Sequence, residues 1–118
     1  MPITRADLAG RRCRACGSGL PPLTSTQVND YLKALPDWHL TEDGHRIRRE
    51  WSAKDFSTAL DFFGRIAVVA EAEDHHPDLH LTAYRSTAVE LWTHALGGLS
   101  ENDFILAARI DELPLETK

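Results

Sequence analysis

Histidines and carboxylates are concentrated in one short stretch of this sequence, between Glu71 and His94. Four of the six histidines lie in it, at positions 75, 76, 80 and 94. The unperturbed pKa of histidine lies nearer to neutrality than that of any other side chain, so neighbouring histidines can both donate and accept protons at physiological pH. The stretch therefore predicts general acid–base chemistry.

Each of these residues also has a structural interpretation. The His-His pair can be a polar loop, His94 can be a hydrogen-bonded strand residue, and Glu71 can be a solvated helix residue. Asp103 suits the first turn of a helix, where the helix dipole favours a carboxylate. We interpret His80 as a surface residue of a strand.

Hydrophobic periodicity and turn residues predict the elements that must position these side chains. Helices are predicted at about residues 24–35, 54–73 and 100–113, and capping sequences that begin at Thr24, Ser52 and Ser100 open them. Strands are predicted at about residues 38–41, 45–51, 79–84 and 87–94. The order is α-β-β-α-β-β-α and the strands form hairpins. The expected fold is therefore α+β, a four-stranded antiparallel sheet with the three helices on one face.

Pro77 ends the long helix and places His75 and His76 in the loop before the third strand. His94 is expected near the end of the fourth strand, from where antiparallel pairing can bring it back toward that loop. The long helix carries apolar residues at i, i+3, i+4 and i+7. The expected buried row consists of Phe56, Ala59, Leu60, Phe63, Ile66, Ala67 and Ala70.

The composition is that of an ordinary globular protein and fits one domain. The chain has 118 residues, of which 42% are hydrophobic and 26% charged. The formal net charge of −5 argues against a nucleic-acid partner. The sequence shows neither an apolar run long enough to span a membrane nor the apolar centre of a signal peptide. A cytoplasmic location is therefore expected.

Residues 1–23 are expected to be a flexible N-terminal extension, and residues 24–118 to be the folded domain. The extension contains Cys13 and Cys16, a Cys-x-x-Cys pair that suits half of a zinc site or a redox pair. No second such pair exists, and adjacent side chains such as those of His75 and His76 diverge, which disfavours a zinc site completed by histidines. We expect two reduced cysteines and no metal.

A multi-part signature in this chain resembles that of the pterin-4a-carbinolamine dehydratases. The likeness extends from about Leu23 to Leu113, and the N-terminal Cys-x-x-Cys is similar to that of bacterial members. The signature reads Glu71, His75-His76-Pro77, Tyr84, His94 and Asp103, in order. The resemblance implies the α-β-β-α-β-β-α fold and a reaction without metal or cofactor, in which 4a-hydroxytetrahydropterin loses water to give quinonoid dihydropterin.

The resemblance also implies roles for the site residues. His75 and His94 would be the acid–base pair, His76 would orient the substrate, and Glu71 and Asp103 would support them. The substrate-binding residues would be Pro77, Tyr84 and Trp92. Which histidine is the acid and which the base is left open, because coupled groups titrate as a set.

A second branch of the family offers a different function. Some dehydratase-like proteins are Rubisco assembly factors, and the segments Pro-Asp-Leu-His-Leu and Leu-Trp-Thr of this chain look like that branch. Under this alternative, the chain would bind Rubisco with little or no enzymatic activity. Either way, sheet edges and an uncovered sheet face favour a homodimer or homotetramer.

Overall fold

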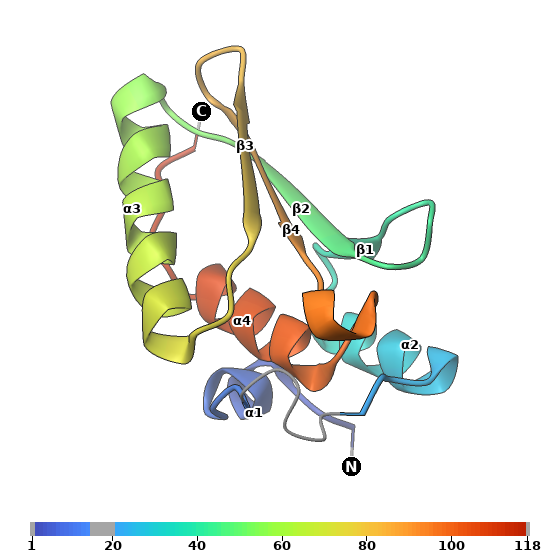
Figure 1. Ribbon diagram of the computed structural model, residues 1–118. Coiled ribbons are helices and arrows are strands. Elements are labelled where there is room, and N and C mark those ends of the chain that lie inside the picture. The colour runs from blue at the N-terminus through green and yellow to red at the C-terminus, as the bar shows by residue number, and fades with distance from the viewer. Residues whose placement is uncertain (1, 15–20, 118) are drawn as a thin grey trace.

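The sheet has four antiparallel strands in the spatial order β1-β2-β4-β3, so β1 and β3 are its edges (Figure 1). The structure is a computed structural model that describes residues 2–14 and 21–117. The strands are β1 (His39–Leu40), β2 (Ile47–Ser52), β3 (Asp78–Thr82) and β4 (Ser86–Leu91). The helices are α1 (Arg5–Ala9), α2 (Ser25–Ala34), α3 (Phe56–Glu73) and α4 (Glu101–Asp111), with a short 3-10 helix η1 (His94–Leu96) before α4.

The predicted α+β class and the order α-β-β-α-β-β-α are confirmed, with two additions. The structure contains α1, where the sequence predicted no regular element, and η1, whose first residue, His94, was predicted to end a strand. Leu8 of α1 is fully buried in the main core. None of the helices in the described part of the chain is long and apolar enough to cross a membrane.

Strands β3 and β4 both end earlier than predicted, β3 at Thr82 and β4 at Leu91. Ala83 and Tyr84 have φ values of 48° and 54°, so they form the hairpin turn instead of extending β3. Thr82 still pairs with Ser86, so the turn comprises residues 83–85, and the Arg85 N–H donates to the Ala83 carbonyl at 2.7 Å. At the other side, β4 ends at Leu91, and Thr93 donates its N–H to the Gly98 carbonyl at 2.8 Å. This bond closes a loop that places His94 in η1.

The side chains of β2 and β4 separate into two faces of the sheet. On the helix-facing side, Ile47 pairs with Leu91 and Trp51 with Thr87. Trp51 packs edge-on against Phe62 of α3, with ring centroids 5.1 Å apart. The outer face is polar, and its Arg48 pairs with Glu90 across the two strands.

The buried row of α3 differs from the predicted one. It consists of Ala59, Phe62, Ile66, Ala70 and Glu73. Phe56, Leu60 and Ala67 are exposed and Phe63 is half-buried. The apolar surface of α3 is wider than the part that the rest of the chain covers. The buried part is the one that contains Phe62, which packs edge-on against Trp51.

Helix α4 is enclosed by the other elements (Figure 1). Every residue from 102 to 108 is buried, because α1 and α3 both pack on α4. Two of these buried residues, Asn102 and Asp103, are polar. Buried polar groups require hydrogen-bond partners, and those of Asp103 lead to the histidine stretch.

Candidate functional site

A buried hydrogen-bond network surrounds Asp103 at the start of α4. One carboxylate oxygen, Oδ1, lies 2.6 Å from Nε2 of His75. The other, Oδ2, accepts hydrogen bonds from the Thr93 hydroxyl and the Ser100 N–H, each at 2.9 Å. The exposed fraction is 4% for His75 and 0% for Asp103, Thr93 and Ser100. Asp103 therefore joins the loop after α3, the end of β4 and the start of α4.

Asp103 is both a helix-capping residue and the partner of His75, because the two roles use different carboxylate oxygens. Ser100 is the N-cap of α4, and Asp103 forms the capping box predicted from the sequence. The capping bond uses only Oδ2, which leaves Oδ1 for His75. An ionised carboxylate only accepts hydrogen bonds, so whenever Asp103 is ionised the donor of the His75–Asp103 bond is Nε2 of His75.

A left-handed residue at the end of α3 turns His75 toward this carboxylate. Asp74 has φ 51° and ψ 43°, the conformation that commonly ends helices. The His75 N–H then bonds back to the Ala70 carbonyl at 3.2 Å, and Pro77 prevents the helix from resuming. His75 is thus fixed by its backbone as well as by its side chain.

His76, the neighbour of His75, is exposed and points to a different partner. Its Nε2 lies 3.6 Å from the Glu71 carboxylate, which is also exposed. The structure therefore places Glu71 beside His76 instead of His75. Pro77 follows, half-buried, at the entry to β3.

His94 is exposed and lies against Trp92, with ring centroids 4.2 Å apart. The residue between them, Thr93, bonds to Asp103, which is also the partner of His75. Arg46, which directly precedes β2, also stacks on Trp92, with its guanidinium carbon 4.6 Å from the ring centroid. The same guanidinium lies 3.1 Å from the Glu90 carboxylate.

Tyr84 is not brought to the histidines within the chain. It lies in the β3–β4 turn, 58% exposed, with Arg85 over its ring. That turn is at the opposite end of the hairpin from Asp78, the first residue of β3. Six residues of strand span about 20 Å.

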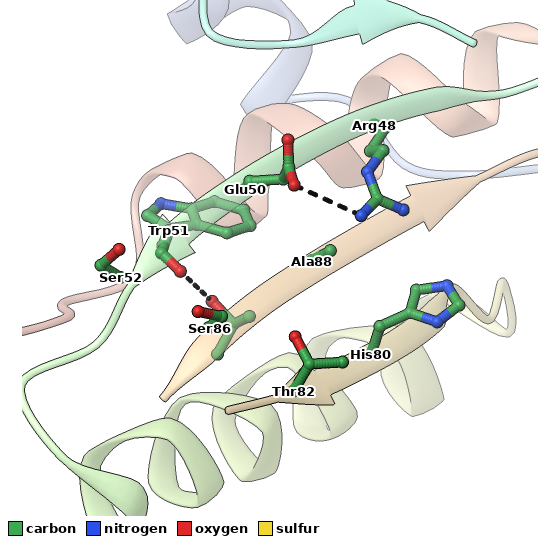
Figure 2. Close-up of a pocket in the computed structure, with 9 residues that line it drawn as sticks. Arg48, Glu50, Trp51, Ser52, His80, Thr82, Ser86 and Ala88 are labelled. Atoms are coloured by element: carbon green, nitrogen blue, oxygen red, sulfur yellow. Dashed lines mark hydrogen bonds and ion pairs between the residues drawn. The ribbon is translucent and has the colours of Figure 1, made fainter. Parts of the chain in front are cut away.

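His80 lies on the outer face of the sheet, as expected for a surface strand residue. Figure 2 shows it at a pocket of about 330 Å³, together with Arg48, Glu50 and Thr82. The pocket lies over β2, β3 and β4, and its lining includes none of the three histidines predicted to be catalytic.

Cys13 does not have the character of a reactive thiol. Burial, and secondarily the Glu73 carboxylate, raise the pKa of the Cys13 thiol to about 12, so it is protonated at neutral pH. Its predicted pair, Cys16, lies outside the described residues. Within residues 2–14 and 21–117, no group of three or more His, Cys, Asp or Glu side chains is arranged to hold a metal ion.

The model of the family described as pterin 4 alpha carbinolamine dehydratase matches residues 21–113. The chain belongs to this family. It is 46% identical over 114 residues to a protein of Arabidopsis thaliana named pterin-4-alpha-carbinolamine dehydratase 2, mitochondrial; the match covers 94% of this chain and 61% of that protein. It is 41% identical to a protein of Nitrosospira multiformis named putative pterin-4-alpha-carbinolamine dehydratase, covering 96% of this chain and 97% of the relative.

A solved structure of the same family supports the fold. The crystal structure of a transcriptional coactivator/pterin dehydratase from Brucella melitensis is similar with a TM-score of 0.72 and 36% sequence identity. The similarity covers 77% of this chain and 96% of the other. The dehydratase family resemblance inferred from the signature is thus confirmed.

Two residues that contact the site were not singled out in the sequence. Thr93 bonds to Asp103 and Arg46 stacks on Trp92. Threonine beside a histidine and arginine after an Asp-Gly turn are common on protein surfaces, so neither carries a local signal. Only the spatial arrangement of the elements shows their positions.

Proposed function

We propose that this chain catalyses the dehydration of a 4a-hydroxytetrahydropterin to the quinonoid dihydropterin. The observation that carries the proposal is the buried 2.6 Å contact between His75 and Asp103 in a member of the dehydratase family. Exposed His76 directly follows His75, and exposed His94 directly follows Thr93, which bonds to Asp103. A positioned histidine–carboxylate couple is a recurrent arrangement for proton transfer, because the carboxylate fixes the ring and stabilises its protonated form.

The reaction requires two proton transfers and no oxidant or reductant, because the loss of water is redox-neutral. The 4a-hydroxyl leaves as water after it receives a proton, and a ring N–H of the pterin gives up its proton as the new double bond forms. We assign these transfers to His75 and His94. His75 is held by Asp103, whereas His94 is held against Trp92.

The remaining residues are assigned to substrate binding and support. His76, beside Glu71, would orient the pterin, and the ring of Trp92 with Pro77 would border it. Tyr84 is excluded from this set within one chain, because its turn lies at the far end of the hairpin. Glu71 would support His76, and Asp103 would support His75.

Turnover by the purified protein tests the proposal directly. 4a-Hydroxytetrahydropterin generated in situ by an aromatic amino-acid hydroxylase decays slowly on its own, and its ultraviolet absorbance reports the decay. We expect this chain to accelerate the decay in proportion to its concentration. Decay at the uncatalysed rate would refute the dehydratase function. Capture of Rubisco by such an inactive protein would then support the assembly-factor interpretation, which otherwise stays a prediction from the sequence.

We also infer that the chain forms a homo-oligomer. The edge strand β3 has no neighbour on its outer side among the described strands, and α3 exposes Phe56 and Leu60, about half of each side chain being accessible. Exposed apolar groups on one helix and an open sheet edge are both surfaces that a second copy can cover. Sedimentation equilibrium is expected to give a dimer or tetramer, and a monomer at micromolar concentration would contradict the inference. The cytoplasmic location stays a prediction.

A further inference from the structure

Residues 11–14, which we call the N-terminal strap, contact the two helix ends that hold the His75–Asp103 couple. At α3, Glu73 accepts hydrogen bonds from the Cys13 N–H at 2.8 Å and from Nε of Arg12 at 2.9 Å. At α4, the side chain of Asn102 makes two bonds to Arg14. Its Oδ1 accepts from the Arg14 N–H at 2.9 Å, and its Nδ2 donates to the Arg14 carbonyl at 2.6 Å.

The two residues that the strap contacts are the near neighbours of the couple in sequence. Glu73 is the last residue of α3 and precedes His75 by two positions, and Asn102 directly precedes Asp103. Both are buried, Glu73 with 7% and Asn102 with 1% of its surface exposed. The strap therefore fixes the end of α3 relative to the start of α4, which is the gap that the 2.6 Å contact crosses.

The buried Glu73 carboxylate is paired both by the strap and by Arg109 of α4. A carboxylate at a helix C-terminus faces the negative end of the helix dipole, and a buried charge without partners is strongly destabilising. Burial alone would raise the pKa of Glu73, but the Cys13 N–H, Arg109 and Arg12 outweigh burial and hold it below its ordinary value. The stabilisation from this carboxylate is therefore complete at neutral pH and is lost only as the pH falls through the lowered pKa.

Further contacts hold the strap to α4. The Arg11 carbonyl accepts a hydrogen bond from Nη2 of Arg109 at 2.6 Å, and the Arg11 guanidinium lies 2.5 Å from the Glu101 carboxylate. The protonated Cys13 thiol lies 3.7 Å from the Asn102 carbonyl, at the length expected for a bond donated by sulfur.

The comparisons separate the strap from the core of the family. The family model begins at residue 21, so it does not include the strap. The Arabidopsis and Nitrosospira relatives match 94% and 96% of this chain, which is more than residues 21–118 contain. The matches to these relatives therefore extend into the N-terminal region, beyond the residues that the family model matches.

We propose that the N-terminal strap is a positioning element for the His75–Asp103 couple, acting through Glu73 and Asn102. The proposal rests on the proposed dehydratase function for its effect on turnover, but its effect on the couple itself does not depend on that function. Loss of either contact would let the ends of α3 and α4 separate, and small displacements of catalytic groups have large effects on kcat.

The test compares variants of the two contact residues with a matched variant of the same N-terminal region. Glu73→Ala and Asn102→Ala remove the strap contacts, and Glu73→Gln keeps an acceptor for the Cys13 N–H without the charge. Leu8→Ala weakens the packing of α1 on α4 but leaves the strap's hydrogen bonds to Glu73 and Asn102 in place. All four are expected to lower the melting temperature.

Two readouts distinguish positioning from general stability. The first is kcat per folded protein, which we expect to fall about tenfold in Glu73→Ala and Asn102→Ala, while KM stays within about threefold of the wild-type value. In Glu73→Gln we expect kcat to recover in part. In Leu8→Ala we expect kcat to stay unchanged. The second is the proton NMR signal of the His75 ring N–H bonded to Asp103, measured without substrate. Its exchange with water is expected to be at least about tenfold faster in the two contact variants than in Leu8→Ala.

The outcomes separate the two proposals. If the wild-type protein does not turn over the pterin, the proposed function fails, and the NMR readout alone decides on the strap. Faster ring N–H exchange in the contact variants supports the strap proposal. Equal exchange in Glu73→Ala, Asn102→Ala and Leu8→Ala at matched stability overturns it, whatever the activity.

Discussion

Replacing His75 and His94 together by alanine is expected to lower kcat for pterin dehydration by about 10²- to 10⁴-fold, the range that general acid–base catalysis typically contributes. The two rings would supply the proton for the departing hydroxyl and accept the proton from the ring nitrogen. Removing both leaves water as the only acid and base. Initial rates at saturating 4a-hydroxytetrahydropterin, corrected for the uncatalysed decay, measure the loss.

His80→Ala is the matched control for this double variant. His80 lies in the same stretch and is exposed, but it faces the pocket on the outer side of the sheet (Figure 2). Its kcat should stay within about twofold of the wild type, because surface substitutions away from a site rarely perturb it. A double His75→Ala, His94→Ala variant that retained more than a tenth of the wild-type kcat would show that these histidines are not the acid and base.

The order of the elements was predictable because its signals are local. The capping boxes at Thr24 and Ser100 both occur where the sequence predicts them, whereas α3 is capped by Asp55, through the Thr58 N–H, instead of by Ser52. An Asp-Gly turn and a proline separate the remaining elements. None of these signals depends on residues distant in the sequence, so the elements that they predict are also found in the folded chain.

Contacts between elements were less predictable. The periodicity of α3 identified an amphipathic helix but selected Phe63 for the core, where Phe62 stacks on Trp51 instead. The choice between two adjacent phenylalanines depends on where the sheet presents its tryptophan. Similarly, His94 was expected to end β4, but the bond from Thr93 to Gly98 closes the strand earlier.

For the site, too, residue types could be predicted from the sequence, but contacts between distant residues could not. The family signature contains His75 and Asp103, and the structure brings them together. No local pattern indicated that Thr93 shares Asp103, or that residues 11–14 hold the helix ends on either side. These contacts join positions that are 10 to 90 residues apart, for which a single sequence carries no pattern.

Asp103→Asn is expected to lower kcat by about 10²-fold or more, with a smaller change in KM, because it reverses the hydrogen bonding of His75. The amide oxygen introduced at position 103 can still accept from the Ser100 N–H and the Thr93 hydroxyl, which satisfies the cap. The amide nitrogen would then face Nε2 of His75 as a donor. Nε2 must become the acceptor, so the ring changes tautomer and loses the charge that stabilises its protonated form. Rates at saturating and at limiting substrate separate kcat from KM.

Asp111→Asn is the control that isolates this effect from the removal of a buried charge. Asp111 lies on the same helix, its side chain is equally buried, and it accepts hydrogen bonds from Trp38 and Arg49, outside the histidine network. Asp111→Asn should reduce stability but leave kcat per folded protein unchanged. Asp103→Asn should reduce kcat even under conditions where the variant is folded to the same extent as the wild type. If both variants lost activity only in proportion to their unfolded fraction, Asp103 would be a helix cap alone. The roles of the two carboxylates differ because the second oxygen of Asp103 faces an imidazole, whereas Oδ2 of Asp111 has no hydrogen-bond partner and lies 3.7 Å from the Arg5 guanidinium.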